Sequence, residues 1–225
     1  MSNKGIIRKQ EILDTAMDLF STKGYSQTTV NDIINLAGFS KGGFYHHFKS
    51  KEEIIDSIIM DYVSETLELS NKIADDPLKN GFEKYKKLFL EIQKRRIKNR
   101  DRYDFLTKMF LSEENILFKY RYTERILKIT QPPLVKIIKQ GKKEGHFKLG
   151  YPEEAAETII SFGTIYRAKI AVLMIDLPTH PENLDKIIRI IHYMQNTIER
   201  ILGLTPGSLN FISQEFQKFI AIKSK

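Results

Sequence analysis

Apolar residues recur at steps of three or four along almost the whole chain, which is the spacing of one face of an α-helix. In residues 6–22, Ile12, Ala16 and Phe20 fall on the same face, and Gly24 follows the point where the pattern stops. Glycine there is typical of the left-handed residue that ends a helix. No sustained alternation of apolar and polar residues is found. The pattern therefore predicts an all-α protein.

Capping signals mark a run of short helices near the N-terminus. Thr29 precedes Asp32 by three residues, which is the spacing of a capping box, and Ser50 repeats that spacing before a second acidic residue. Ser40 is an N-cap candidate between them, and Gly38 permits a tight turn just before it. The helix that begins at Thr29 and the one that begins at Ser40, joined by this turn, form a helix-turn-helix candidate. The three helices are expected at about residues 29–37, 40–48 and 50–67.

Beyond residue 70 the expected helices are longer. Asp76 followed by Pro77 is typical of an N-cap and a first helical residue. Pro132 and Pro133 are expected to break a helix, and Ser208 is expected to cap a terminal one. The expected ranges are about 76–92, 99–110, 113–130, 132–144, 152–177, 182–202 and from 208 onward.

The second helix of the candidate motif is unfavourable on intrinsic grounds. Gly42 and Gly43 each cost about 1 kcal/mol relative to alanine in a helix. Close approach to another surface, such as the wall of a DNA groove, would explain two adjacent glycines. The polar side chains around them are donors suited to phosphate oxygens: Ser40, Lys41, Tyr45, His46, His47 and Lys51.

The charge distribution is compatible with an anionic partner. The 225 residues include 36 basic and 28 acidic ones, a net charge of +8, which favours nucleic acid or an anionic surface without identifying either. No acidic residue lies between Asp32 and Glu52, so one face is kept clear for an anion. Residues 79–108 carry 11 basic and 4 acidic groups. We interpret this second cluster as a solvated helix face. The alternative is that part of it lies against the DNA that flanks the binding site and adds electrostatic affinity.

Other classes of protein are disfavoured. The absence of cysteine excludes disulfides and thiol chemistry. His46 and His47 are adjacent and cannot share a helix face, so no metal site is expected. No acid–base set, nucleophile or glycine-rich phosphate loop is visible, so neither an enzyme nor a cofactor is expected. The N-terminus lacks the apolar core of a signal peptide, and apolar runs fall far short of the roughly 20 residues of a membrane span. We expect a cytoplasmic protein without a membrane segment.

A larger set of residues, spread from Lys9 to Ile58, occurs in a characteristic order. It comprises Leu19-Phe20, Gly24-Tyr25, Thr28-Thr29, Ile33, Ala37-Gly38-Phe39-Ser40, and Phe44-Tyr45-x-His47-Phe48-x-x-Lys51-Glu52. This combination closely resembles the DNA-binding domain of TetR-family bacterial repressors and covers about 50 of the 225 residues. The resemblance implies a three-helix helix-turn-helix DNA-binding domain over residues 1–52, with the motif at about 29–48. A helical effector-binding and dimerisation domain would then occupy residues 53–225.

The resemblance also implies roles for single residues. Phosphate contacts fall on Thr29, Tyr45, His47 and Lys51. Base edges in the major groove would face Lys41 and the two glycines, and a lysine there can donate to guanine. The complete set of expected DNA contacts is Thr28, Thr29, Ser40, Lys41, Gly42, Gly43, Tyr45, His46, His47 and Lys51.

The C-terminal part is expected to hold an effector and to form a homodimer. The effector would be small and apolar or amphipathic, with polar anchors open among Glu113, Glu114 and Arg167. Candidate pocket residues are Phe105, Met109, Phe110, Phe118, Tyr122, Phe162 and Tyr166; the alternative for each of them is an ordinary core residue. The two last long helices are apolar on more than one face, so one face needs a partner. Candidate interface residues are Ile159, Phe162, Tyr166, Ile187, Ile191, Met194, Ile198 and Ile201.

These features lead to one principal functional hypothesis and two alternatives. The principal one is a repressor that binds double-stranded DNA as a homodimer and is released by a small ligand. Two-fold symmetry would make the operator palindromic. The alternatives are a constitutive DNA-binding protein with a filled C-terminal core and, from another class, a helical small-molecule carrier or enzyme.

Overall fold

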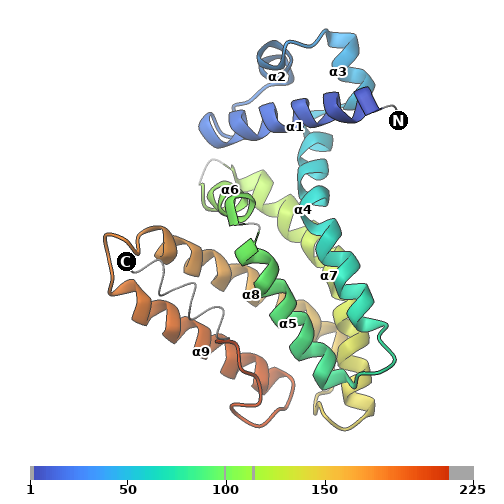
Figure 1. Ribbon diagram of the computed structural model, residues 1–225, viewed down its shortest axis with the longest axis vertical. Helices are drawn as coiled ribbons and strands as arrows, with labels where there is room; N and C mark the ends of the chain where they lie inside the picture. The colour runs from blue at the N-terminus through green and yellow to red at the C-terminus, as the bar shows by residue number, and fades with distance from the viewer. Residues whose placement is uncertain (1–2, 99, 113–114, 213–225) are drawn as a thin grey trace. The chain divides into compact units, whose positions relative to one another are not determined.

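The computed structural model of the chain describes residues 3–98, 100–112 and 115–212 (Figure 1). Over these residues the chain is helical and contains no strand, which confirms the all-α class. The helices are α1 (Asn3–Thr22), α2 (Val30–Ala37), α3 (Lys41–His47), α4 (Lys51–Ala74), α5 (Gly81–Lys98), α6 (Arg100–Leu111), α7 (Ile116–Lys143), α8 (Pro152–Ile175) and α9 (Asn183–Ile201).

The chain divides into two compact units. The N-terminal unit comprises Met1–Ser64 and Phe105–Arg125, and the C-terminal unit comprises Glu65–Asp104 and Ile126–Lys225. The division passes through α4, whereas the expected functional boundary at residue 52 lies in the first turn of that helix. Because compactness does not report which residues bind DNA or an effector, that functional boundary remains a prediction.

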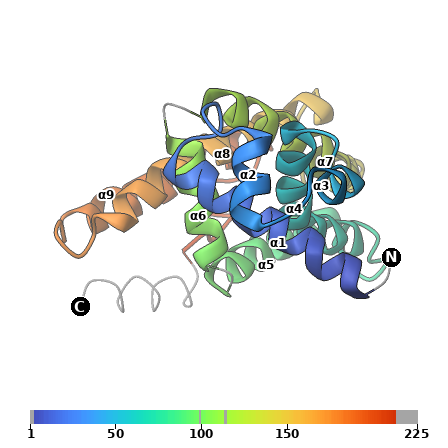
Figure 2. The same ribbon diagram turned by 90° about the horizontal axis from the view of Figure 1, so that it is seen from above.

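One apolar core holds the N-terminal unit together. The helices α1, α2 and α3 of this unit are seen from above in Figure 2. Ile12 of α1, Ile33 of α2 and Phe44 of α3 are fully buried in it. Burial of such a side chain contributes roughly 1.5–3 kcal/mol. Later segments of the chain complete the same cluster through Leu106, Met109 and Phe118.

The expected caps of the short helices are confirmed. Thr29 Oγ1 accepts the N–H of Asp32 at 3.1 Å, and the Asp32 carboxylate accepts the N–H of Thr29 at 2.8 Å, which completes the capping box. Ser40 Oγ accepts the N–H of Gly43 at 3.1 Å and caps α3. Gly38, with a φ of 66°, takes the left-handed conformation that ends α2. These local bonds fix where α2 ends and α3 begins.

The expected start of α5 at Asp76 and Pro77 is wrong. The Asp76 carboxylate instead accepts a backbone N–H two residues on, in a turn. α5 begins at Gly81, where Asn80 Oδ1 accepts the N–H of Glu83 at 2.9 Å and the Glu83 carboxylate accepts the N–H of Asn80 at 3.0 Å. This reciprocal pair satisfies two backbone donors, whereas Asp76 satisfies one.

The expected break at Pro132 and Pro133 is also wrong, because α7 runs through both residues. Each proline removes one backbone donor from the helix. In the turn of α7 that follows the prolines, the side chains of Leu134, Ile137 and Ile138 are buried. Burial of this apolar face stabilises the helix across the missing hydrogen bonds.

No helix begins at Ser208 within the described residues, which end at 212. The buried Glu199 carboxylate accepts the N–H of Leu209 at 2.7 Å, and Gln195 Oε1 accepts the N–H of Phe211 at 3.2 Å. These side chains of α9 take up backbone donors of the segment, so it packs without helical bonds of its own. The rest of the expected terminal helix, residues 213–225, lies outside the described part of the chain.

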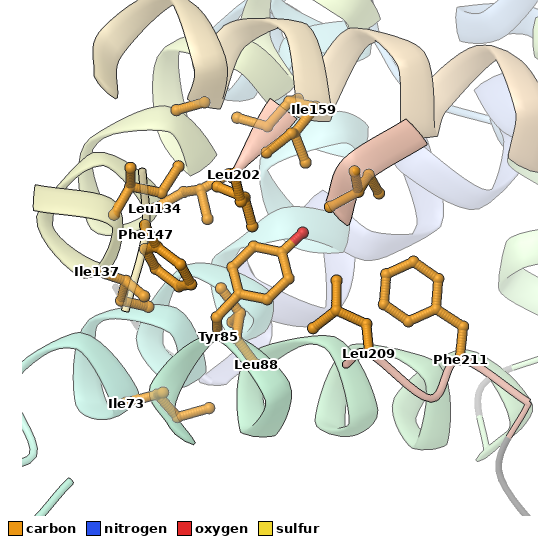
Figure 3. Packing of buried hydrophobic residues seen from close by; sticks show 14 of the residues in the cluster. Ile73, Tyr85, Leu88, Leu134, Ile137, Phe147, Ile159, Leu202, Leu209 and Phe211 are labelled. Atoms are coloured by element: carbon orange, nitrogen blue, oxygen red, sulfur yellow. The ribbon is translucent and has the colours of Figure 1, made fainter. Parts of the chain in front are cut away.

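A second apolar cluster, mostly aliphatic, forms the core of the C-terminal unit (Figure 3). Its members come from α4, α5, α7, α8 and α9 and from the segments after α7 and after α9. The residues labelled in Figure 3 are Ile73, Tyr85, Leu88, Leu134, Ile137, Phe147, Ile159, Leu202, Leu209 and Phe211.

α8 leaves much apolar surface uncovered. Of the described helices it is the one that is long and apolar enough to cross a membrane, judged by length and composition alone. Only 11% of its most apolar stretch is buried within the chain, and Ile165 and Val172 are exposed. A search for uninterrupted apolar runs does not detect this property, because Arg167 and Lys169 interrupt the apolar sequence of α8.

Candidate nucleic-acid interface

α2 and α3 form a helix-turn-helix whose inner side is fixed by buried residues. Ile33 and Ile34 anchor α2, and Phe44 anchors α3. Between them, the N–H of Phe39 donates to the carbonyl of Ile34 at 3.1 Å and closes the turn. The outward face of α3 is therefore held in place by the core beneath it.

That outward face gathers most of the expected DNA-contact residues. Lys41, Gly42, Tyr45 and His46 are exposed, whereas Phe44 is fully buried. Tyr45 is 53% exposed and is therefore not a core aromatic residue. A lysine, a phenol and an imidazole on one helix supply donors for phosphates and base edges.

The two glycines of α3 differ in their surroundings. A Cβ on Gly42 would have no neighbouring atom within 4 Å, so the fold itself does not require glycine there. A Cβ on Gly43 would lie 3.1 Å from the capping Ser40 Oγ. Close approach of an external surface is therefore a better explanation for Gly42 than for Gly43.

His47 is half-buried at the end of α3. Its Nδ1 is buried and makes no hydrogen bond within the described residues. Burial lowers the pKa of His47, and the nearby His46, Arg8 and Lys9 lower it further. The neutral imidazole is thereby favoured in the free protein, and an approaching phosphate would favour the charged form.

Three of the expected contact residues have structural partners within the chain. Thr28 is buried, and its hydroxyl donates to the carbonyl of Gly24 at 2.8 Å. The hydroxyls of Thr29 and Ser40 serve as the caps of α2 and α3, although both residues remain exposed. Direct DNA contacts by these three side chains remain predictions.

Lys51 is also used within the chain. Its Nζ donates to the carbonyls of Tyr25 at 2.5 Å and Thr28 at 2.8 Å. The same ammonium lies 4.2 Å from the centre of the Tyr25 ring, in cation–π range. Lys51 therefore ties the start of α4 to the loop before α2, and its expected phosphate contact is untested.

Arg8 and Lys9 lie beside the motif and were not among the expected contacts. The guanidinium of Arg8 lies 5.7 Å from the ring centre of Phe39, and Lys9 Nζ lies 5.4 Å from that of Phe48. Both cations thus stand next to the turn and the end of α3. The available sequence signal was the absence of acidic residues before Glu11.

The structure divides the candidate pocket residues between two clusters. Phe105, Met109, Phe110, Phe118 and Tyr122 pack in the core of the N-terminal unit. Phe162 and Tyr166 lie instead on α8, with ring centres 4.6 Å apart and the ring of Tyr193 close to both. The seven residues therefore do not line one apolar cluster. Of the three possible polar anchors, Glu113 and Glu114 lie outside the described residues, and Arg167 lies on α8.

Most of the candidate interface residues are buried inside the chain itself. Ile159, Ile187, Ile191, Met194 and Ile198 are all buried and belong to α8 or α9. They cannot face a partner while this packing persists. The apolar surface that remains on the two helices includes Phe162, Ile165, Tyr166, Val172, Ile175, Tyr193 and Ile201.

Comparison with known proteins matches residues 12–58 to a family described as bacterial regulatory proteins, tetR family. The HTH-type transcriptional repressor KstR2 of Mycolicibacterium smegmatis is 41% identical over 56 residues, which are 25% of this chain and 27% of that protein. The same repressor from Rhodococcus jostii is 43% identical over 58 residues, 26% of this chain and 28% of the relative. The chain thus matches about a quarter of the length of these curated relatives.

A solved structure extends the likeness over the whole fold. SmeT, the repressor of the Stenotrophomonas maltophilia multidrug efflux pump SmeDEF, superposes with a TM-score of 0.60 at 17% identity. The superposition covers 91% of this chain and 94% of SmeT. The shared architecture is an N-terminal helix-turn-helix region followed by a helical C-terminal region.

Proposed function

We propose that this chain, whose residues 12–58 match the tetR family of bacterial regulatory proteins, is a sequence-specific DNA-binding regulator of transcription. The observation that carries the proposal is the exposed face of α3, where Lys41, Tyr45 and His46 surround Gly42. The buried Phe44 fixes this face from beneath. The chain acts through binding and not as an enzyme, in the cytoplasm, where bacterial DNA lies.

α3 enters the major groove with its N-terminal end toward the base edges. Lys41, in the first turn, donates to guanine O6 and N7, and the absent side chain at Gly42 lets the helix backbone approach closely. Tyr45 and His47 bond to phosphates, which hold the helix in register but carry no sequence information. Arg8 and Lys9 add positive charge beside the groove. Each neutralised phosphate contributes about −0.9 to the slope of log affinity against log salt.

The decisive experiment is selection of bound fragments from the organism's own genome, followed by fluorescence anisotropy on the best fragment. Lys41→Ala should weaken the best site by about 1–3 kcal/mol and reduce discrimination at one position. Lys72→Ala, an exposed lysine in the last turn of α4, is the matched control and should change neither. If no fragment binds more tightly than random DNA, the proposed function fails.

Homodimerisation is part of the proposal. The exposed apolar side chains of α8 and α9, among them Ile165 and Tyr193, are too many for a helix pair that meets only water. A second copy with two-fold symmetry would cover them and present two α3 helices to successive major grooves. The operator is then palindromic, with half-sites about one helical turn apart.

Repression with release by a small apolar or amphipathic effector completes the proposal. Such a molecule would be bound by a mostly apolar pocket in the C-terminal unit. Titration of candidate compounds into the complex with DNA tests this step, and a fall in anisotropy on binding supports it. A protein that binds DNA identically with every compound would be a constitutive DNA-binding protein.

A further inference from the structure

Within the N-terminal unit, one carboxylate of α4 is shared between two arginines of α7. Asp56 Oδ2 lies 3.8 Å from Nη1 of Arg121 and 3.7 Å from Nη2 of Arg125. Both distances are in ion-pair range, but both exceed the length of about 2.7–2.9 Å that a hydrogen bond from a cation to a carboxylate has. The two arginines are one helical turn apart, so Asp56 stands between them and makes a direct hydrogen bond with neither.

α4 and α7 run in the same direction from a common starting point. The N–H of Tyr25 donates to Asn115 Oδ1 at 2.7 Å, directly before α7. The Tyr25 hydroxyl donates to Glu52 Oε1 at 3.4 Å, in the first turn of α4. Asp56 and Arg121 meet further along both helices, so the helices stay side by side in a parallel arrangement.

A shift of half a turn, about 2.7 Å, would give Asp56 a direct partner in either direction. Movement of α7 toward the start of α4 brings Arg125 to Asp56 and Arg121 toward Glu52. Movement away from it brings Arg121 to Asp56 and leaves Arg125 to water. Between 31% and 35% of each of the three paired side chains is exposed, so water can solvate the group that is released.

Each of these two pairings replaces two long contacts with one charge-assisted hydrogen bond. Shifts of about 1–2 Å between packed helices are a common form of conformational switching. Larger movements are opposed by Phe118 of α7, because its ring is buried in the core of the N-terminal unit. The helix pair therefore has two accessible registers that are less than one turn apart.

The register of α7 is connected to the helix-turn-helix by hydrogen bonds. Asn115 holds the N–H of Tyr25, and Lys51 of α4 donates to the carbonyls of Tyr25 and Thr28. These residues form the loop that ends at Thr29, the N-cap of α2. A shift of α7 along α4 therefore displaces the loop from which α2 begins. Both α4 and α7 continue into the C-terminal unit, so events there can bias the register.

We propose that Asp56, Arg121 and Arg125 form a register switch between α4 and α7, and that its two pairings give α3 different affinities for DNA. The second half of this inference rests on the proposed function, whereas the two pairings do not. A static surface ion pair is the competing interpretation, in which loss of either arginine has the same small effect.

The absence of cysteine from the chain allows two introduced cysteines to report the register in the full-length protein. Spin labels are placed at Ser64→Cys, beyond Asp56 on α4, and at the exposed Tyr120→Cys, before Arg121 on α7. Arg121→Gln leaves Asp56 to Arg125, so α7 should move toward the start of α4. The distance between the labels, measured by double electron–electron resonance, should then lengthen by about 2–3 Å.

The reverse substitution has the opposite sign. Arg125→Gln leaves Asp56 to Arg121, so the distance between the labels should shorten by a similar amount. Asp56→Asn removes the shared partner and should broaden the distance distribution around that of the wild type. Lys128→Gln, at an exposed lysine one turn beyond Arg125, is the matched control and should leave the distance unchanged.

Operator affinity should change in opposite directions in the two arginine variants. In anisotropy with the selected DNA fragment, one variant should bind roughly 2–5-fold more tightly than the wild type and the other 2–5-fold more weakly, the range expected for a partly exposed ion pair. Loss of charge cannot produce this pattern. Each variant loses one positive charge, which by itself would weaken both complexes.

Label distances that stay constant, or that change in the same direction in both arginine variants, overturn the switch. Opposite distance changes with equal operator affinities overturn its connection to α3. If no DNA fragment binds specifically, the proposed function fails, and the label distances still decide whether the two registers exist.

Discussion

At the scale of the residue, substitutions of Gly42 should affect DNA binding without disturbing the fold. Its Cβ position is open, so Gly42→Leu should leave the free protein folded and raise its stability by up to about 1 kcal/mol through helix propensity. The same side chain would prevent close approach to the groove and remove specific binding. Thermal unfolding by circular dichroism and anisotropy with the selected fragment measure the two effects.

Gly43→Ala is the matched comparison for this prediction. Its Cβ would press on the Ser40 hydroxyl that caps α3, so it should gain less stability than Gly42→Ala. If Gly42→Leu binds the operator like the wild type, α3 does not approach the groove at that point.

His47 gives the interface a pH dependence whose sign can be worked out. Its pKa is lowered in the free protein, so its neutral form stabilises the fold above the unfolded pKa of about 6.5, and this contribution is lost as the pH falls. A phosphate favours the charged form, so DNA binding should take up a proton. Affinity for the operator should rise roughly 3–10-fold between pH 7.5 and 5.5 at constant ionic strength.

His47→Gln should flatten this dependence, and His146→Gln, at an exposed histidine of the C-terminal unit, should not. A profile that stays steep in His47→Gln would assign the titration to another group.

At the scale of the element, Asn115 ties two loops of the N-terminal unit together. It is buried, its Oδ1 accepts the N–H of Tyr25 at 2.7 Å, and its Nδ2 donates to the carbonyl of Met109 at 3.3 Å. Asn115→Ala would leave both backbone groups buried without this partner. It should lower the free energy of unfolding by about 1–3 kcal/mol in urea denaturation.

Asn71→Ala, at an exposed position of α4, is the control for Asn115 and should change the free energy by less than about 0.5 kcal/mol. Equal effects of the two substitutions would mean that the Tyr25 N–H finds water without cost.

The elements that the sequence predicts well are those whose signals are local. Thr29 and Ser40 cap α2 and α3 because a hydroxyl meets a backbone N–H three residues away, which spacing alone reveals. The prolines of α7 fail as a break because burial of Leu134 outweighs them, and burial depends on partners distant in sequence. The internal contacts of Lys51 could likewise not be predicted, because the carbonyls that it contacts become its neighbours only on folding.

The same difference between local signals and contacts distant in sequence decides which features of the candidate sites could be predicted. The exposed face of α3 could be predicted because Phe44 and the polar residues beside it follow helical periodicity. The division of the candidate pocket residues between two clusters could not, since it depends on contacts that form only on folding. Arg167 was one of three anchors that the sequence left equivalent.

At the scale of the whole molecule, dimerisation determines how many α3 helices reach one operator. The interface should use the exposed side chains of α8 and α9. The test therefore avoids buried positions such as Ile191, where a charge would unfold the chain and report nothing about association. Ile165 and Tyr193 are 53% and 52% exposed, so Ile165→Glu combined with Tyr193→Glu should fold normally and be monomeric by light scattering at micromolar concentration.

Loss of the dimer should then appear in DNA binding without any change to α3. Two linked half-site contacts gain roughly 10²–10⁴ in affinity over one, so the monomeric variant should bind the palindrome at least about 100-fold more weakly. Leu78→Glu, at an 89% exposed residue outside α8 and α9, should remain dimeric and bind normally. If the double variant stays dimeric, or if the wild type is a monomer, the uncovered surface of α8 has another occupant and the operator need not be symmetric.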